Sequence, residues 1–319
     1  MKLSFFRFGL VGTASFLPLS LIALVVFLTL YSWPAIQYNG LEFFWQNNWD
    51  LGNLYGNPVE IRGQQVMPGA SFGIWFLVVG TLASAFLALI FALPIAVATA
   101  YFLAEMLPKW LSGPLALLVD LLAAIPSVVF GLWGYALLIP FLGQSVFPWL
   151  ASHLSFVPFF GGSPGSGYGL FTTAIVLAFM VIPLISATMR EGISAIEPAL
   201  KEAGLGMGLN RLEVLWHIIL PKLKTTLVGV SILALGRALG ETMAVVMVSG
   251  NALNYLPNNI YTPISTMAAF IVSQLESALQ DPTNMAVEAL AEIALVLLIL
   301  TVIVNIIARL ILWGAKVRT

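Results

Sequence analysis

Six long apolar segments limit what this sequence can fold into. Each holds about 20 or more mainly apolar residues, the length that a helix needs to cross the hydrocarbon core of a bilayer. A chain of 319 residues that is 60% hydrophobic and 8% charged also lacks the polar surface that a soluble globule requires. We therefore predict an all-α integral membrane protein with six transmembrane helices near residues 10–33, 71–102, 111–142, 169–189, 225–250 and 286–313.

Composition excludes several other classes of protein. The net charge of -1 offers no basic surface to nucleic acid. The absence of cysteine removes disulfides, thiolate metal sites and Cys nucleophiles. No cluster with metal-ligand spacing and no nucleophile–base set stands out, and His153 and His217 are interpreted as surface residues. The sequence therefore predicts neither an enzyme nor a resident metal.

Two of the predicted spans have special features. The first follows Lys2 and Arg7, but its apolar stretch is longer than the core of a signal peptide and has no evident cleavage site, so we expect a retained helix. The third contains Pro126, which cannot donate an intrahelical hydrogen bond. We expect the helix to kink or split there.

Positive charges predict the orientation of the chain. Eleven of the 13 Lys and Arg residues fall on one side of the predicted spans, and the exceptions are Arg62 in an opposite loop and Arg237 within a span. Because Lys and Arg collect on the cytoplasmic side, we predict a multi-pass protein with both termini in the cytoplasm and with outer loops 34–70, 143–168 and 251–285. The predicted parts are an N-terminal helix with its outer loop (1–70), a permease-like membrane domain (71–313) and a cytoplasmic tail (314–319).

The long inner loop at about 190–224 carries the most specific motif. Its pattern is Glu-Ala-Gly, three residues, Gly, nine residues, Ile, one residue and Leu-Pro, formed by Glu202, Ala203, Gly204, Gly208, Ile218, Leu220 and Pro221. This resembles the EAA loop of ABC importer permeases, apart from a Gly at the third position. The resemblance implies a short cytoplasmic coupling helix that inserts into a groove of an ATPase subunit. We expect Glu202 near the positive start of that helix. An ordinary amphipathic surface helix is the alternative.

Four charges stand out inside the predicted spans, where burial in hydrocarbon is costly. They are Asp120, Arg237, Glu241 and Glu292. Arg237 and Glu241 are four residues apart, so on one helix their side chains can reach each other. Counted from the start of its span, Arg237 lies about 18 Å into the membrane, near the midplane. Because the Arg fork binds two oxygens of an oxyanion, Arg237 and Glu241 are candidates for a substrate pathway.

Other roles for these residues stay open. The Arg237–Glu241 pair can instead be a structural lock between helices. Glu292 can line the pathway or sit at the outer end of its helix, and Asp120 can cap or pair within the third span. Ser127, just after Pro126, can offer its hydroxyl and free N–H groups to an anion, or simply mark a packed kink. Three carboxylates against one Arg also predict that a partner subunit supplies a cation.

A wider resemblance suggests a substrate. The segments GRALGETMAV, LLAAIPSVVFGLWG and EAGLGMG resemble the PstC family of bacterial phosphate permeases over most of the chain. This implies the type I (MetI-like) ABC importer permease fold in the bacterial inner membrane. It also implies a homologous permease partner PstA, a dimer of the ATPase PstB and the periplasmic phosphate-binding protein PstS. The pathway residues of the family carry over as Arg237 and Glu241. A sulfate or molybdate permease is the alternative. A secondary transporter, which would be expected to show inverted repeats or paired broken helices, fits less well with six spans and one long coupling loop.

Nucleotide binding is expected on the partners. The chain has no GxxxxGK[ST] phosphate loop, so we expect ATP and Mg²⁺ to bind the ATPase subunits and no cofactor to bind this chain. Beyond these proteins, membrane lipid is the remaining predicted partner.

Overall fold

The computed structural model describes the backbone of residues 2–316 and the side chains of residues 12–310. The chain forms two compact units: unit 1 comprises Met1–Trp75 and Ile271–Ile299, and unit 2 comprises Phe76–Phe270 and Leu300–Thr319. Six helices in the described part are long and apolar enough to cross a membrane, at Gly12–Tyr31, Trp75–Met106, Ser127–His153, Leu170–Ser194, Arg211–Leu239 and Met285–Leu310. The prediction of a helical membrane protein is confirmed, although two spans are organised differently from the prediction.

Unit 1 combines helices with two small two-stranded sheets, one of which is a β-hairpin. Its elements are α1 (Lys2–Tyr31), α2 (Trp33–Asn39), η1 (Gly40–Phe44), β1 (Trp49–Asp50), β2 (Val59–Ile61), β3 (Gln64–Val66), β4 (Ser71–Phe72), most of α13 (Met267–Ala278) and the first part of α14 (Met285–Lys316). Strand β1 pairs with β4 and β2 pairs with β3, both antiparallel. Between β2 and β3, Arg62 and Gly63 have φ of 54° and 78°, which suits a two-residue turn in a hairpin.

Helix α1 has no buried side chain from Gly12 to Tyr31. It is apolar on all sides, as expected for a helix that lipid or another subunit surrounds. The predicted tail 314–319 overlaps the end of α14, and its last three residues lie outside the described part of the chain.

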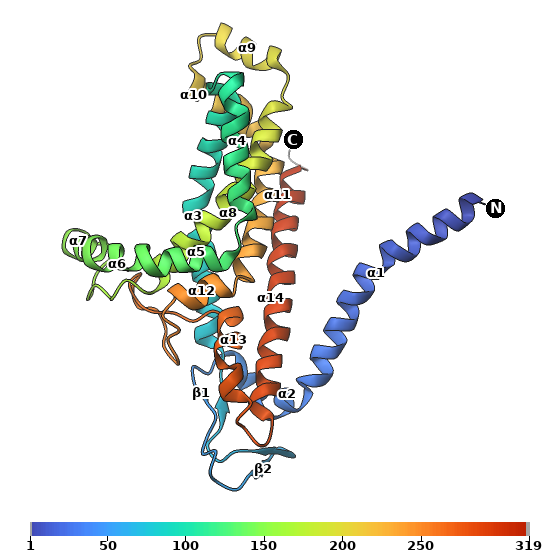
Figure 1. Ribbon diagram of the computed structural model, residues 1–319, viewed down its shortest axis with the longest axis vertical. Coiled ribbons are helices and arrows are strands. Elements are labelled where there is room, and N and C mark those ends of the chain that lie inside the picture. Colours follow the sequence, from blue (N-terminus) through green and yellow to red (C-terminus); the bar gives the residue numbers. More distant parts are fainter. Residues whose placement is uncertain (1, 317–319) are drawn as a thin grey trace. The chain divides into compact units, whose positions relative to one another are not determined.

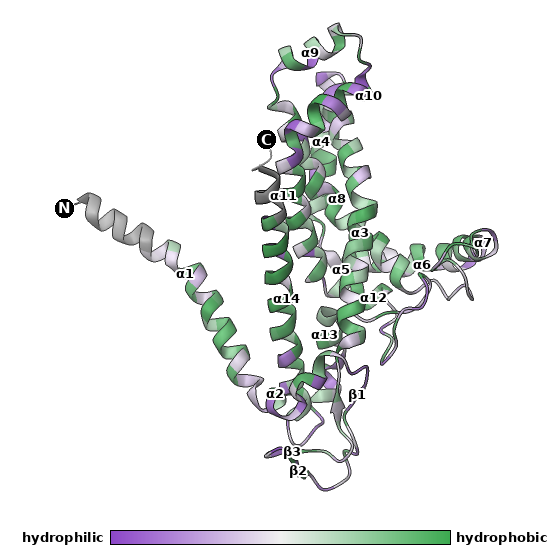
Figure 2. Cartoon of the chain, turned by 180° about the vertical axis from the view of Figure 1, so that it is seen from behind, coloured by the Kyte–Doolittle hydropathy of each residue, from purple (hydrophilic) through white to green (hydrophobic). Residues whose placement is uncertain are grey.

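Unit 2 is built around a core of upright helices (Figure 1). They are α3 (Trp75–Tyr101), its π-helical end η2 (Phe102–Met106), α4 (Lys109–Ala124), α8 (Leu170–Ser194) and α11 (Leu220–Leu239). Helix α3 presents a stripe of fully buried alanines at three- or four-residue intervals, Ala85, Ala88, Ala92, Ala96 and Ala100. These alanines belong to the same core as larger side chains of α8. Small residues on one helix allow the neighbouring helix to approach closely. The same helices are hydrophobic along most of their length, with polar residues gathered near α9 (Pro198–Gly206) and α10 (Arg211–Val214) (Figure 2).

The third predicted span is split at Pro126. Helix α4 ends at Ala124, and both Ile125 and Pro126 have extended ψ values of 129° and 139°. A residue before proline avoids the helical region, so the chain cannot continue the helix here. The following run of α5 (Ser127–Trp133), η3 (Gly134–Leu138), α6 (Ile139–Phe141), η4 (Leu142–Val146) and α7 (Phe147–His153) lies across the direction of α4 (Figure 1). The expected split is confirmed, whereas a single span over residues 111–142 is wrong.

The fifth predicted span is also divided. Helix α11 ends at Leu239, and α12 (Met243–Val248) begins after a break at residues 240–242. Helix α12 then packs against α5. A Cβ atom added to Gly131 of α5 would lie 2.8 Å from Met247 Sδ, and one added to Gly134 would lie 2.8 Å from Val248 Cγ1. Two glycines therefore allow the segments that follow the two breaks to pack directly together.

Candidate coupling loop and membrane charges

The two ends of the loop motif are in contact. Gly204 is buried on α9, and a Cβ atom placed on it would lie 2.4 Å from Ile218 Cδ1 and 3.3 Å from Val214 Cγ2. The glycine at this position therefore lets α9 lie against the helix that carries the Ile-x-Leu-Pro part of the motif. Ile218 Cδ1 is the far end of a flexible side chain, so an alanine at position 204 would require only a small shift of Ile218, whereas a larger residue would not fit without separating the two helices.

Gly208 ends α9 in a defined turn. Its φ of 92° is in the region that favours glycine. The N–H of Gly208 donates to Leu205 O at 3.0 Å, and the N–H of Leu209 donates to Gly204 O at 3.2 Å. These two bonds form the Schellman motif, in which a glycine after the last helical residue satisfies the free carbonyls of the helix. The Gly of the sequence motif is thus explained by the turn.

The second half of the motif begins a long helix. Asn210 and Glu213 form a reciprocal capping box at the start of α10. The helix continues through the π-helical turn η5 (Leu215–Ile219) into α11. Pro221 follows directly and cannot donate to the carbonyl four residues before it, and a widened turn relieves the clash of its ring with that carbonyl. The Ile-x-Leu-Pro sequence therefore marks a local widening of the helix.

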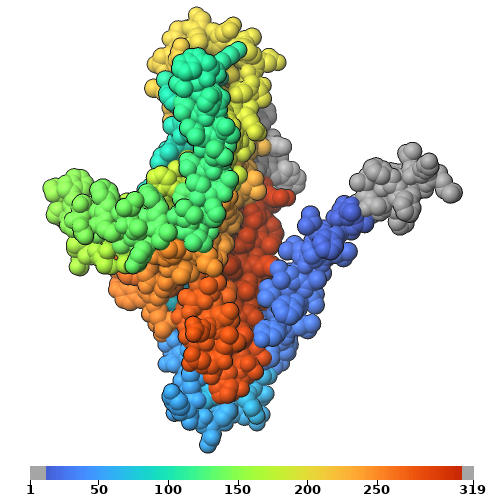
Figure 3. Space-filling view, viewed as in Figure 1, coloured from blue at the N-terminus to red at the C-terminus, as the bar shows by residue number. Residues whose placement is uncertain are grey.

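The loop presents a mixed apolar and polar surface. Glu202 and Ala203 are exposed, and near them Leu205, Met207, Leu212 and Trp216 are between 46% and 78% exposed. Figure 3 shows the α9 segment, in yellow, at one end of unit 2. Glu202 lies in the middle of α9, and the first turn of this helix holds no acidic residue. The expected position of Glu202 at the helix start is therefore wrong: Glu197 precedes the first turn instead, because Pro198 begins the helix.

An ion pair that the sequence did not reveal holds α9. Lys201 Nζ lies 2.6 Å from Glu105 Oε1 of η2 and donates to Ile193 O of α8 at 2.8 Å. The side chains of Lys201 and Glu105 are 13% and 28% exposed. No spacing rule connects residues 96 positions apart in the chain, so this contact depends on the tertiary fold.

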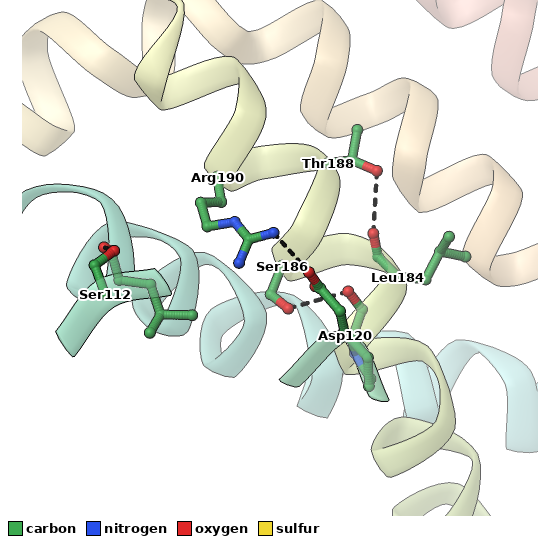
Figure 4. A network of polar contacts seen from close by, with 8 residues as sticks. Ser112, Asp120, Leu184, Ser186, Thr188 and Arg190 are labelled. Carbon is green, nitrogen blue, oxygen red and sulfur yellow. Dashed lines mark hydrogen bonds and ion pairs between the residues drawn. The ribbon is translucent and has the colours of Figure 1, made fainter. Parts of the chain in front are cut away.

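Asp120 is paired with Arg190 between α4 and α8. Arg190 Nη2 lies 2.8 Å from Asp120 Oδ2, as Figure 4 shows. Arg190 was counted with the loop charges, but it lies within α8, and its side chain is 19% exposed. The second carboxylate oxygen, Oδ1, is buried without a hydrogen-bond partner among the described residues. Asp120 is therefore paired, but with a residue of another helix and not within the third span as expected.

Glu292 belongs to unit 1. Asn39 Nδ2 of α2 donates to Glu292 Oε2 of α14 at 2.7 Å, and Glu292 is 4% exposed. A buried carboxylate held by an amide from a neighbouring helix fastens the two helices together. In this structure Glu292 therefore serves packing within unit 1, and nothing here brings it to the other charges.

Arg237 and Glu241 are separated by the break in the predicted fifth span. Arg237 lies near the end of α11, whereas Glu241 lies beyond the last helical residue, Leu239. Neither forms an ion pair with any residue that the structure describes, and Arg237 is exposed in this chain. We expected Arg237 and Glu241 to lie on one face of a continuous helix and to contact each other. This is wrong, because the helix does not continue through Gly240.

These contacts change the predicted charge balance. Asp120 is neutralised by Arg190, and Glu292 is held in unit 1. Glu241 and Glu292 then remain as two carboxylates against Arg237, because the Asn39 amide that holds Glu292 carries no charge. The excess of carboxylates that predicted a cation from a partner subunit is therefore reduced from two to one.

Ser127 begins α5 and is partly exposed. Its hydroxyl has no hydrogen bond within the described part of the chain, and α5 packs against α12, which follows the break beside Arg237. Ser127 and Arg237 are thus both next to a break in a helix, and no contact joins them here. Their common role in a pathway stays a prediction.

The Asp120–Arg190 pair is expected to stabilise the fold. Because Asp120 is 40% exposed, removing either partner should lower the free energy of unfolding by only about 1–2 kcal/mol. We expect Asp120→Ala and Arg190→Ala to be non-additive, with a coupling energy of about 1 kcal/mol in a double-mutant cycle. Thermal unfolding of the purified complex in detergent measures this, and additive effects would contradict the assignment.

Comparison with known proteins identifies the class of this fold and loop. The chain belongs to the family of binding-protein-dependent transport system inner membrane components, which matches residues 92–312. The inward-facing MetNI methionine ABC transporter contains a chain with a similar fold: the TM-score is 0.52, the identity is 16%, and the match covers 76% of this chain and 96% of that one. The predicted ABC importer permease fold is confirmed.

Closer relatives are phosphate permeases. Over 278 residues the chain is 43% identical to the phosphate transport system permease protein PstC 1 of Mycobacterium tuberculosis, covering 86% of this chain and 82% of the relative. Over 303 residues it is 38% identical to the phosphate transport system permease protein PstC of Pasteurella multocida, covering 94% and 88%. The predicted resemblance to the PstC family is confirmed. The match to the transport family begins at residue 92, so most of unit 1 lies outside it.

Proposed function

We propose that this chain is a permease subunit of an ATP-driven importer of inorganic phosphate in the bacterial inner membrane. The observation that carries the proposal is the similarity to PstC phosphate permeases over nearly the whole chain. The chain supplies part of the membrane pathway, and hydrolysis of ATP belongs to other subunits. The names of these relatives favour phosphate over sulfate or molybdate.

The loop 190–224 is the proposed contact with the ATPase. Its support is a short helix closed by the Gly208 turn, packed through Gly204 and bordered by exposed apolar side chains. Apolar side chains on an exposed helix suit a hydrophobic groove of a partner. On this proposal, closure of the ATPase dimer PstB displaces α9, and ATP and Mg²⁺ bind only to PstB.

Orientation and the other partners follow from the same proposal. The positive charges of the sequence support cytoplasmic termini and a cytoplasmic coupling loop. The two-stranded sheets of unit 1 then lie on the periplasmic side, where the binding protein PstS delivers phosphate. The homologous permease PstA completes the pathway beside the exposed Arg237.

Arg237 is the proposed cation of the pathway. It lies near the predicted midplane of the membrane, it is exposed in the isolated chain, and no carboxylate among the described residues pairs with it. A guanidinium without a carboxylate partner is free to donate to phosphate oxygens. Glu241, Ser127 and the backbone at the two helix breaks are candidates for the remaining contacts.

Reconstitution tests the function directly. The chain, purified with its partner permease, ATPase and binding protein, is placed in liposomes with ATP. We expect phosphate uptake and phosphate-stimulated ATP hydrolysis, with no competition from a tenfold excess of sulfate or molybdate. If the complex takes up sulfate or molybdate instead of phosphate, the substrate assignment is wrong. If it takes up phosphate without ATP, the class of transporter is wrong.

A further inference from the structure

Lys201 is held more firmly than two other Lys residues of the same loop. Its ammonium contacts a carboxylate, Glu105, and a backbone carbonyl, Ile193 O, at 2.6 and 2.8 Å. By contrast, Lys222 and Lys224 are exposed and form no ion pair with the residues that the structure describes. A long side chain loses conformational freedom when it is fixed in this way, so the contact has a conformational cost that ordinary surface lysines avoid.

The Glu105 end of the contact lies on an unusual turn. Residues Phe102–Met106 form a π-helical turn at the end of α3, and such turns interrupt the normal bonding of a helix. Ser112 Oγ of α4 donates to Leu103 O of this turn at 2.5 Å. The turn that receives Lys201 is therefore fastened to the next helix as well, which connects α9 with both α3 and α4.

The end of α3 also holds the far side of the coupling loop. Tyr101 Oη donates to Arg211 O, at the start of α10, at 2.7 Å. Lys201 and Arg211 thus lie on either side of the Gly208 turn, and each is bonded to a residue near the end of α3. A cavity of about 140 Å³ lies among these groups and is lined by Tyr101, Glu105, Lys201, Leu205, Arg211, Val214 and Ile219.

We propose that Lys201 is a positioning residue that makes the coupling loop move together with the end of α3. Helix α9 is joined covalently to α8 and, through α10, to α11, and these links alone would direct a displacement of α9 into those two helices. The Lys201–Glu105 contact adds a third route, into α3 and through Ser112 into α4. The helix that ends at the Pro126 break then responds to the ATPase. This inference rests on the proposed function of the loop.

The test measures coupling in the complete complex in liposomes. Phosphate taken up and ATP hydrolysed are measured together for Lys201→Met, Glu105→Gln and the exchanged pair Lys201→Glu with Glu105→Lys. Lys109→Met is the matched control, since Lys109 is exposed, forms no ion pair with the described residues and lies outside the proposed ATPase contact. We expect Lys201→Met and Glu105→Gln to lower the phosphate transported per ATP by about tenfold, because either change breaks a partly buried ion pair.

The exchanged pair separates positioning from stability. If the contact transmits motion, the exchange restores at least half of the wild-type ratio of phosphate to ATP, while the control keeps the full ratio. Wild-type ratios in Lys201→Met and Glu105→Gln would overturn the inference. So would an equal loss of uptake and hydrolysis that leaves the ratio unchanged, which indicates simple destabilisation. A wild-type complex that shows no phosphate-stimulated hydrolysis would instead contradict the proposed function.

Discussion

Gly204→Val is expected to remove most of the ATPase activity that phosphate-loaded binding protein stimulates. The Cβ atom alone would lie 2.4 Å from Ile218 Cδ1, and the valine methyl groups need further space. Overpacking of this kind costs about 1–3 kcal/mol, which is sufficient to separate α9 from the helix beneath it. ATP hydrolysis by the complex and co-purification of the ATPase subunits measure the effect.

A size exchange makes this prediction specific. Ile218→Val removes the Cδ1 atom that meets position 204, so it should partly rescue Gly204→Val. Gly206→Val is the matched control on the same helix, because nothing lies within 4 Å of a Cβ atom there. If Gly206→Val is as harmful as Gly204→Val, helix propensity explains the loss and the contact between the two ends of the motif does not.

Arg237→Gln is expected to lower phosphate uptake by roughly 10- to 100-fold, because hydrogen bonds between charged groups are worth about 1.5–3 kcal/mol each. Arg237→Lys keeps the charge but loses the planar fork, so its phosphate uptake should lie between that of the wild type and that of Arg237→Gln. Uptake of radioactive phosphate into liposomes that hold the complete complex measures this. The substitution should leave assembly intact, since Arg237 bonds to no described carboxylate.

The control for Arg237 lies on another helix. Arg309→Gln removes an exposed positive charge of α14 that forms no ion pair with the described residues, and it should leave uptake unchanged. Normal uptake by Arg237→Gln in an assembled complex would remove Arg237 from the pathway. Equal losses in both variants would point to a general effect of removing a positive charge.

Local rules predicted the parts of this molecule that depend on neighbours in the chain. The length and apolar content of the segments predicted the helices that can span a membrane, and Pro126 predicted the split of the third span. Gly208 was recognised by its place in a motif, and its φ of 92° explains that place. These features follow from backbone geometry and from the hydrophobicity of single segments, both of which a sequence displays directly.

Features that depend on distant contacts were missed or wrongly placed. The partners Arg190 for Asp120, Lys201 for Glu105 and Asn39 for Glu292 lie in other helices. The break after Leu239 was missed because no proline marks it, and apolar residues continue on both sides. Membrane helices lack the polar pattern that would reveal which faces meet, so pairing between them cannot be read from one sequence.

The two helix breaks also limit what can surround unit 2 in a membrane. At Pro126 and at Gly240 the backbone leaves the helix, and both residues are exposed in the single chain. Peptide groups outside a helix cannot face acyl chains, because hydrocarbon offers them no hydrogen bonds. Water or a second polypeptide must therefore cover these breaks. Acyl chains alone could not solvate these two breaks, so a bilayer that holds this chain must admit water or another polypeptide at both positions.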